Sequence, residues 1–320
     1  MAALAHQPAD RTPRFEIWID ALHEELGVPD PASAYAALGQ DGVMLPTRQP
    51  AESRAWKTGI DEWGRVWHAG MYHDGVVHDE ASLERYSPPN AYAAAFFSPD
   101  QARQVRAQHP DHCLIYGTHA GPFTAAYMAM GFERFFTRLV DDIAFVHRLL
   151  AARTRWCIAL YQQAVDLGAQ VLVLGDDAAH KDGPMISPDL WRDLVLPYHR
   201  QIVKALDRPV IWHSDGNVEA LLPMAVEAGF VGVHGIEPAA GMRLSQVRSA
   251  WGEQLTLIGN VDVRALLSDD AAWVRREVDR CLAEGGRDGG YMLATCNSIF
   301  EGMSPAAAAT YFQYSAEATA

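Results

Sequence analysis

The sequence predicts a (β/α)8 barrel, and two observations favour this fold class over a doubly wound sheet. In the second half of the chain, short apolar runs that end in polar residues alternate with amphipathic helical stretches, as in right-handed βαβ units on a parallel sheet. None of these runs leads into the glycine motifs of nucleotide-binding sheets, G-x-G-x-x-G or G-x-x-x-x-G-K-[ST]. We therefore expect residues 1–320 to form one barrel domain.

Composition narrows the class of function. Hydrophobic residues make up 49% of the chain, which suits a large buried core, and the four cysteines are too few for a disulfide framework. The formal net charge of −14 argues against nucleic acid and anionic membranes as partners. The first residues lack the features of a signal peptide, and no apolar run is long enough to span a membrane. We expect a cytoplasmic protein that acts on a small molecule.

The strands are predicted from short apolar runs taken in chain order. The first-half runs are less regular than the later ones, which are nearly continuously apolar, as in parallel strands buried on both faces. The predicted strands cover residues 43–46, 114–119, 171–177, 209–215, 231–237, 255–262 and 290–297.

Helix signals occupy the segments between these strands. Ser187, followed by proline, begins a helix that Pro197 should kink. Residues 132–167 are expected to form two helices, with a break near Asp141 or Arg153.

Two additions to the barrel are expected outside its repeating units. One is an N-terminal helical segment. The other is a β-hairpin over residues 63–78, where apolar and polar residues alternate around glycines.

Polar side chains follow the last five predicted strands, where barrel enzymes carry their catalytic groups. These residues are Asp176, Asp177, His213, Asp215, Glu237, Asn260, Asp262, Cys296 and Asn297. Each has an ordinary structural explanation by itself, because an Asp after a strand commonly caps the next helix. Burying them together without a ligand would cost several kcal/mol. The convergence therefore favours a functional cluster with His213 at its centre.

Two histidines and the cysteines refine this prediction. His119 ends the strand at 114–119 and is a further candidate for the site, whereas His234 lies within a strand and is expected to be packed there. Cys296 is the cysteine at a strand end, and the other three lie in contexts typical of core residues. A His and a Cys from two strand ends could share a Zn²⁺ ion, with Asp215 or Glu237 as a further ligand.

At these strand ends the sequence resembles the uroporphyrinogen decarboxylase superfamily. The similar runs are GDDAAHKDGPMISPDLWRDLVLPYHRQIV, IWHSDGN, GIEPAAGM, LIGNVD and GGYMLATCNSI, preceded by DEWGRVW at 61–67 and GTHAGPF at 117–123. They occur in order with family-like spacing and cover most of the chain. The resemblance implies the same (β/α)8 barrel.

The resemblance offers two chemistries. The haem-pathway decarboxylases remove carboxyl groups from a porphyrinogen without metal or cofactor, and they grip it with an N-terminal arginine-rich loop of the form RQAGR. The corresponding region here reads RTPRFEIWIDALHEELG, so that guanidinium clamp for a polyanionic substrate is missing.

The other branch comprises corrinoid-linked methyltransferases, several of which hold Zn²⁺ with a His-x-Cys pair and a late cysteine. His213 matches the histidine and Cys296 the late cysteine, but Asp215 stands where the thiol-activating members have Cys. An oxygen ligand makes the metal harder and more Lewis-acidic. The resemblance therefore implies either an oxygen-linked methyl donor or a site without metal.

The resulting prediction is a methyltransferase that moves a methyl group from a small, oxygen-linked donor to a corrinoid protein. The expected metal ligands are His213, Asp215 and Cys296; the catalytic candidates are Asp176, Asp177, Glu237 and His119; the substrate-binding candidates are Asn217, Asn260, Asp262 and Asn297. A decarboxylase and a non-catalytic ligand-binding barrel are the alternatives. The oligomeric state is left open, with a homodimer among the options.

Overall fold

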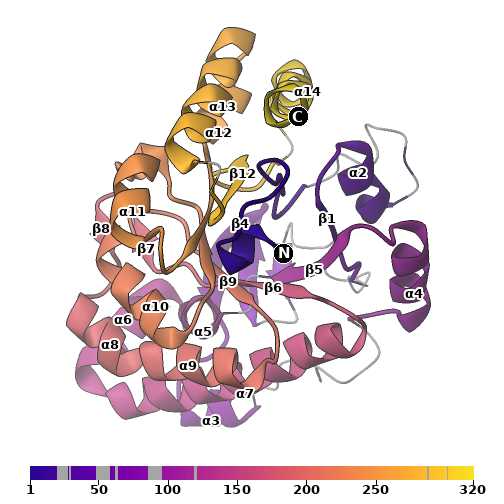
Figure 1. Ribbon diagram of the computed structural model, residues 1–320. Helices are drawn as coiled ribbons and strands as arrows, with labels where there is room; N and C mark the ends of the chain where they lie inside the picture. Colours follow the sequence, from indigo (N-terminus) through magenta and orange to yellow (C-terminus); the bar gives the residue numbers. More distant parts are fainter. Residues whose placement is uncertain are drawn as a thin grey trace.

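A parallel sheet curled into a ring lies at the centre of the computed structural model (Figure 1). The structure describes residues 1–19, 28, 30–47, 58–61, 64–85, 96–118, 121–286, 288–300 and 302–320. Within these residues the sheet has seven parallel strands in ring order, namely β1 (Gly42–Met44), β5 (Cys113–Thr118), β6 (Val171–Gly175), β9 (Val210–His213), β10 (Gly232–His234), β11 (Thr256–Val261) and β12 (Tyr291–Thr295). Each coincides with a predicted strand, and the predicted fold class is confirmed.

An extended segment, residues 13–19, lies between β12 and β1 and closes the ring. The N–H of Phe15 donates to the carbonyl of Leu293 in β12 at 3.2 Å, and the N–H of Asp41, just before β1, donates to the carbonyl of Arg14 at 2.9 Å. The pairing with β12 begins at Pro13, whose carbonyl accepts from the N–H of Leu293 at 2.9 Å; the proline ring leaves no N–H of its own to donate. This segment therefore takes the eighth place in the barrel without forming a regular strand.

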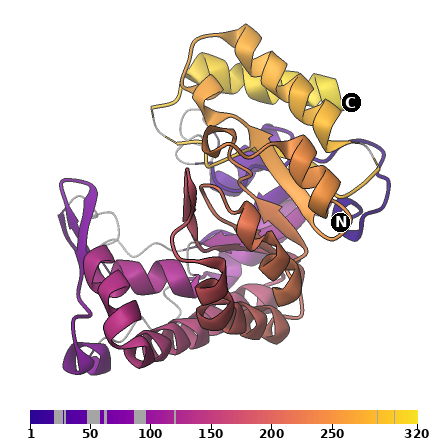
Figure 2. The same cartoon turned by 90° about the vertical axis from the view of Figure 1, so that its left-hand side faces the viewer.

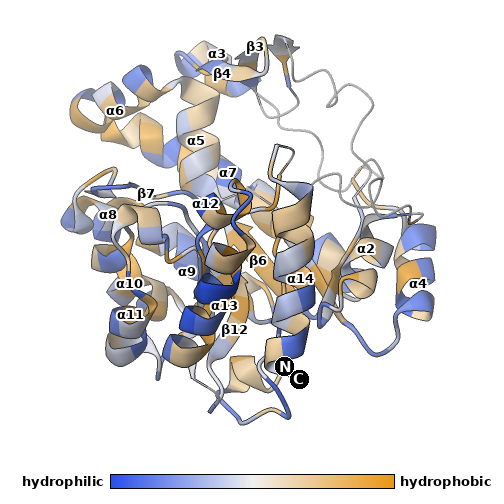
Figure 3. Ribbon diagram, turned by 90° about the horizontal axis from the view of Figure 1, so that it is seen from above, coloured by the Kyte–Doolittle hydropathy of each residue, from blue (hydrophilic) through white to orange (hydrophobic). Residues whose placement is uncertain are grey.

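The helices surround the ring, as Figure 1 shows from one end and Figure 3 from above. They are α2 (Pro31–Ala37), α3 (Glu80–Arg85), α4 (Pro99–Gln108), α5 (Pro122–Met130), α6 (Phe132–Asp141), α7 (Ile143–Asp166), α8 (Pro188–Leu194), α9 (Leu196–Ala205), α10 (Leu222–Ala228), α11 (Leu244–Trp251), α12 (Val263–Leu266), α13 (Ala271–Gly285) and α14 (Pro305–Thr319). Short 3₁₀ turns lie at η1 (Ala3–Ala5), η3 (Glu219–Leu221) and η4 (Pro238–Ala240). The described N-terminal helical elements, η1 and α2, flank the extended segment.

Both predicted helix interruptions are present. Pro197 lies in the first turn of α9, and Val195 separates this helix from α8, because proline cannot supply the hydrogen bond that would continue α8. The break in 132–167 lies at Asp142, whose side chain accepts from the N–H of Phe145 and caps α7.

The predicted hairpin is part of an antiparallel sheet that stands away from the ring (Figures 2 and 3). Its strands are β2 (Thr58–Ile60), β3 (Arg65–His68) and β4 (Met71–Gly75), and residue 63 lies outside the described part of the chain. Tyr72 donates to the carbonyl of Met128 at 2.9 Å, and a Cβ at Gly75 would lie 2.1 Å from the backbone of Ala129. Close packing therefore ties this sheet to α5.

The core fills the ring and the space between strands and helices. The strands β6 and β12 are fully buried, and so are large side chains such as Trp191 in α8 and Trp212 in β9. Among the described helices, none is both long and apolar enough to cross a membrane. In contrast to this apolar core, polar side chains gather at the carboxyl ends of the central strands.

Candidate functional site

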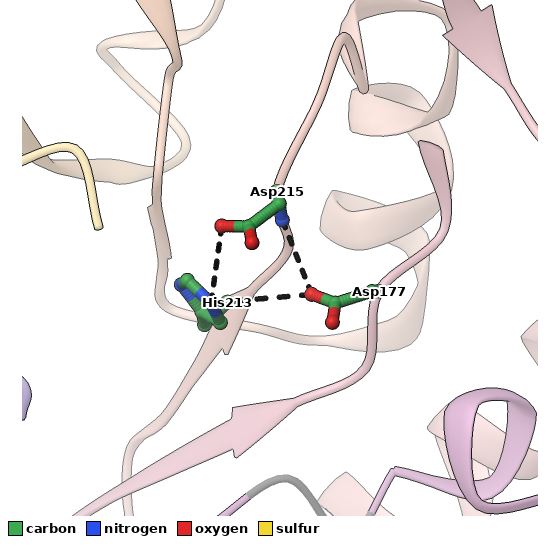
Figure 4. A group of neighbouring side chains, drawn as sticks. All are labelled: Asp177, His213 and Asp215. Carbon is green, nitrogen blue, oxygen red and sulfur yellow. Dashed lines mark hydrogen bonds and ion pairs between the residues drawn. The ribbon is translucent and has the colours of Figure 1, made fainter. Parts of the chain in front are cut away.

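Three ligand-type side chains meet at the carboxyl ends of β6 and β9 (Figure 4). Nε2 of His213, the last residue of β9, lies 3.5 Å from Oδ1 of Asp215 and 3.9 Å from Oδ1 of Asp177. All three ligand atoms lie within 4.8 Å of one another. A tetrahedral zinc ion with bonds of about 2.0–2.2 Å separates its ligand atoms by about 3.3–3.6 Å. The three side chains, named the Asp-His-Asp cluster below, therefore have nearly the dimensions of a metal site.

Backbone contacts between the two strand ends hold the Asp-His-Asp cluster together. The N–H of Asp215 donates to Oδ1 of Asp177 at 3.2 Å, and the N–H of Asp177 donates to the hydroxyl of Thr124 at 2.6 Å. Gly216, directly after Asp215, has φ +80°, and a Cβ there would lie 2.7 Å from the backbone of Ala179. The turn that orients Asp215 therefore requires glycine.

The cluster carries excess negative charge. Burial and the neighbouring carboxylates of Asp177 and Glu237 together raise the pKa of Asp215 to about 7, against the opposing hydrogen bond from Asn297. The side chain of His213 is 1% exposed, whereas those of Asp177 and Asp215 are 23% and 41% exposed. The carboxylates thus face the open side, and a cation placed between them would relieve their repulsion.

Two more predicted site residues border the cluster. Nδ2 of Asn297 donates to Oδ1 of Asp215 at 2.8 Å, so the β12 end reaches the β9 end. Glu237, after β10, accepts from the N–H of Gly216 at 2.9 Å. The structure therefore brings residues from four strand ends to one place.

Aromatic rings enclose the buried side of His213. The indole of Trp18 lies edge-on to its imidazole with ring centroids 4.9 Å apart, and the ring of His234 lies at the same centroid distance on another side. His213 and His234 are partners in the β9–β10 register, and their Nδ1 atoms are 2.7 Å apart.

Asp176 has the contacts of a capping carboxylate. It is completely buried and accepts from the N–H groups of Phe123 and Thr124 at the start of α5, at 3.3 Å and 2.7 Å, and from Nε2 of His199 at 2.7 Å. A Cβ at Gly121 would lie 2.1 Å from Cβ of Asp176, which shows how closely α5 approaches. Its carboxylate is fully engaged away from the cluster.

Three predicted substrate-binding residues are engaged with protein groups. The buried Asn260 donates to the carbonyl of Ile236 and accepts from Arg280, and Asp262 pairs with Arg264 at the start of α12. Asn217 donates to the carbonyl of Ala240 at 3.2 Å and accepts from the N–H of Glu219.

The remaining predicted residues have different positions. Cys296 is a free thiol, 1% exposed, and among the described residues the group of closely spaced ligand atoms contains Asp177 rather than this cysteine. Burial raises the pKa of the Cys296 thiol, since the thiolate would be poorly solvated there. His119 lies outside the described residues.

Sequence reasoning expected His234 to be packed and gave it no part in the site. The side chain is indeed fully buried, but its ring contacts His213 directly. The signal was available in the strand ends VIWHSD and VGVHGIE, because a histidine stands at the same place in two adjacent parallel strands.

Comparisons with known proteins converge on one family. A family model described as uroporphyrinogen decarboxylase (URO-D) matches residues 68–317. A uroporphyrinogen decarboxylase from Pseudomonas paraeruginosa is 27% identical over 320 residues, covering 96% of this chain and 80% of the relative. A methylated-thiol–coenzyme M methyltransferase from Methanosarcina mazei is 27% identical over 183 residues, which is 57% of this chain and 48% of that one.

Among solved structures, a methyltransferase from Methanosarcina mazei aligns with a TM-score of 0.74 and 22% identity, covering 99% of this chain and 96% of that one. The alignment includes nearly the whole of both proteins. At this level of identity it shows a shared fold.

Proposed function

The chain belongs to the uroporphyrinogen decarboxylase family, and within it we propose a methyltransferase that moves a methyl group from a small, oxygen-linked donor to a corrinoid carried by a partner protein. The family is enzymatic, and it contains relatives named for decarboxylation and relatives named for methyl transfer. The choice between these reactions depends on what the mouth of the barrel can bind.

The Asp-His-Asp cluster carries this proposal. Two of its three members are carboxylates, Glu237 adds a third nearby, and their mutual repulsion contributes to the raised pKa of Asp215. Such a mouth attracts a divalent cation and repels a substrate with many carboxylates. The positive charge of Arg264 interacts with the carboxylate of Glu237, but Nε and Nη2 of this guanidinium group both donate to Asp262.

The donor set fits zinc. One imidazole nitrogen and two carboxylate oxygens are ordinary zinc ligands, and three protein ligands leave a position open in catalytic sites. Asp177, His213 and Asp215 would hold the ion, whereas the thiol of Cys296, which the family resemblance suggested as a ligand, lies outside this group of closely spaced ligand atoms among the described residues. A zinc ion there would supply Lewis acidity toward the oxygen of the methyl donor.

The chain's own residues complete the proposed site. Asn297 holds Asp215 through the 2.8 Å hydrogen bond and keeps its carboxylate turned toward His213. The donor's oxygen needs a proton once its methyl group has left, and Glu237 is the carboxyl group proposed to deliver it. The indole of Trp18 covers one side of His213 and excludes water from it.

Metal analysis of the purified protein tests the proposal. We expect about one zinc per chain, and loss of the metal in His213→Ala with the fold retained by circular dichroism. A protein that neither contains zinc nor takes it up after dialysis against the metal would contradict the proposal.

Decarboxylation remains the second candidate because the Pseudomonas relative carries that name. Incubating the chain with uroporphyrinogen separates the two reactions, and we expect no loss of carboxyl groups. Turnover that is insensitive to chelators would overturn methyl transfer in favour of decarboxylation. A barrel that only binds a ligand would bind the methyl donor without transferring its methyl group to any corrinoid protein.

A further inference from the structure

A chain of contacts runs behind His213, from the carbonyl of Thr295 through the ring of His234. We propose that His234 is a positioning residue that holds His213 in the tautomer whose bare Nε2 faces Asp177 and Asp215. The purpose of this arrangement rests on the proposed metal site, whereas the tautomer itself is a property of the protein alone.

The geometry starts from a carbonyl group. His234, completely buried in β10, has its Nε2 3.0 Å from the carbonyl oxygen of Thr295 in β12. Its Nδ1 lies 2.7 Å from Nδ1 of His213 in β9. The two rings therefore form a bridge from β12 to the Asp-His-Asp cluster.

The position of each proton follows from these contacts. A carbonyl oxygen only accepts, so Nε2 of His234 must carry the hydrogen. A neutral imidazole has one N–H, which leaves Nδ1 of His234 as an acceptor. Nδ1 of His213 then donates across the 2.7 Å contact, and in the neutral His213 ring Nε2 keeps its lone pair.

The start of the chain of contacts is itself fixed. The N–H and hydroxyl of Thr295 donate to the two carboxyl oxygens of Glu16 at 2.9 Å and 2.6 Å, and Tyr311 donates to the same carboxyl group. These bonds hold the peptide of Thr295 between the closing segment and α14. Its carbonyl consequently points at His234 with little freedom.

The arrangement suits a metal ligand. A histidine binds a metal through a nitrogen that carries no hydrogen, and a partner at its other nitrogen fixes the tautomer and the ring orientation. With the opposite tautomer, His213 would present an N–H to the position between the two carboxylates. His234 would thus prepare His213 for the metal before any metal arrives.

Long-range ¹H–¹⁵N correlation spectra of ¹⁵N-histidine-labelled, metal-free protein test the proposal directly. The His213 signals are assigned as those absent from His213→Asn. In the wild-type chain we expect the Nδ1–H tautomer of His213, and in His234→Phe a mixture of both tautomers, because the ring remains but the acceptor is gone. His234→Asn supplies an amide oxygen near the position of Nδ1 and should restore the Nδ1–H form.

A wild-type protein with a hydrogen on Nε2 of His213, in the Nε2–H tautomer or in the doubly protonated ring, would overturn the proposal, as would an unchanged tautomer in His234→Phe. His199→Asn is the matched control, because it removes another buried histidine that contacts Asp176 instead. It should leave the His213 signals in the wild-type pattern.

Zinc titration gives the second readout. Loss of the hydrogen-bond partner of a metal-binding histidine typically weakens metal binding roughly 10- to 100-fold. We expect a loss of this size for His234→Phe, and an affinity close to that of the wild type for His234→Asn. If the wild-type chain binds no zinc but shows the Nδ1–H tautomer, the metal site fails while the positioning role of His234 stands. If it binds zinc and His234→Phe binds it equally well, the positioning role fails.

Discussion

The backbone N–H of Asp215 donates to Oδ1 of Asp177 across 3.2 Å, so a carboxylate from one strand end orients the residue at the next. The bond joins the ends of β6 and β9 directly in front of His213. It also keeps two acidic side chains close together despite their repulsion, which contributes to the raised pKa of Asp215.

Asp177→Asn should lose the zinc ion while Cys296→Ser keeps it. The asparagine removes a negative ligand from the Asp-His-Asp cluster, whereas the buried thiol lies outside that group among the described residues. Zinc per chain after gel filtration is the measurement. Retention by Asp177→Asn together with loss from Cys296→Ser would instead identify the cysteine as the ligand.

Cobalt substitution reports the ligand type by absorption. With Co²⁺ in the Asp-His-Asp cluster, we expect weak visible bands and no sulfur-to-metal charge-transfer band, because nitrogen and oxygen supply the ligands. Asp215→Cys should add that band, and Asp215→Ser, as the control, should not. A charge-transfer band in the wild-type protein would show that Cys296 binds the ion.

Asp176→Asn should lower the free energy of unfolding by about 3 kcal/mol or more. The substitution removes the negative charge and one acceptor oxygen, so that the buried groups in contact with this carboxylate lose a partner. The new amide nitrogen would face a backbone N–H that now donates to the carboxylate, either that of Phe123 or that of Thr124, depending on which oxygen it replaces. Urea unfolding measures the loss, and zinc content should be unchanged. A variant as stable as the wild type but devoid of metal would return Asp176 to the catalytic site.

Glu16 should make the fold less stable as pH rises. Burial raises the pKa of its carboxyl group to about 7, against an ordinary value near 4.5, so the folded chain binds more protons than the unfolded chain between these pH values. The contribution of the protonated group is complete below about pH 4.5 and is lost as pH rises through 7, on the order of 3 kcal/mol in total.

Glu16→Gln should remove this decline. The amide can accept from Tyr311 and from the N–H of Thr295, and can donate to the hydroxyl of Thr295. Unfolding free energies of both proteins at pH 5 and pH 8 give the comparison. Parallel pH profiles for the two would show that Glu16 does not titrate in this range.

The barrel was predictable because each parallel strand is a short apolar run with a polar end, and burial on both faces leaves that trace in the sequence. The closing segment could not be predicted in this way. Residues 13–19 are held by the side chain of Glu16 and by single backbone hydrogen bonds, and they show no run of apolar residues typical of a buried strand. The hairpin followed from its glycines, but β2 was missed because its three residues are all exposed and show no alternation.

The site was predictable only as a set of strand ends. His213, Asp215 and Asn297 meet as their positions suggested, but Asp176 and Asp177 are adjacent in sequence and turn opposite ways, one toward the start of α5 and one toward the cluster. Successive side chains leave a strand in different directions, and which of them faces the mouth depends on packing with α5 that sequence spacing does not show.

The contact between Glu16 and Thr295 joins residues 279 positions apart in the chain. On a ribosome that adds about 5–20 residues per second, Glu16 waits roughly 15–55 s before its partner is made. The seam between the first and last parts of the barrel is therefore the last to form during synthesis, and its loop closure is the slowest. If the Thr295 carbonyl orients His234 as proposed, His213 is prepared only when the ring is complete, and a half-made chain would lack the proposed metal site.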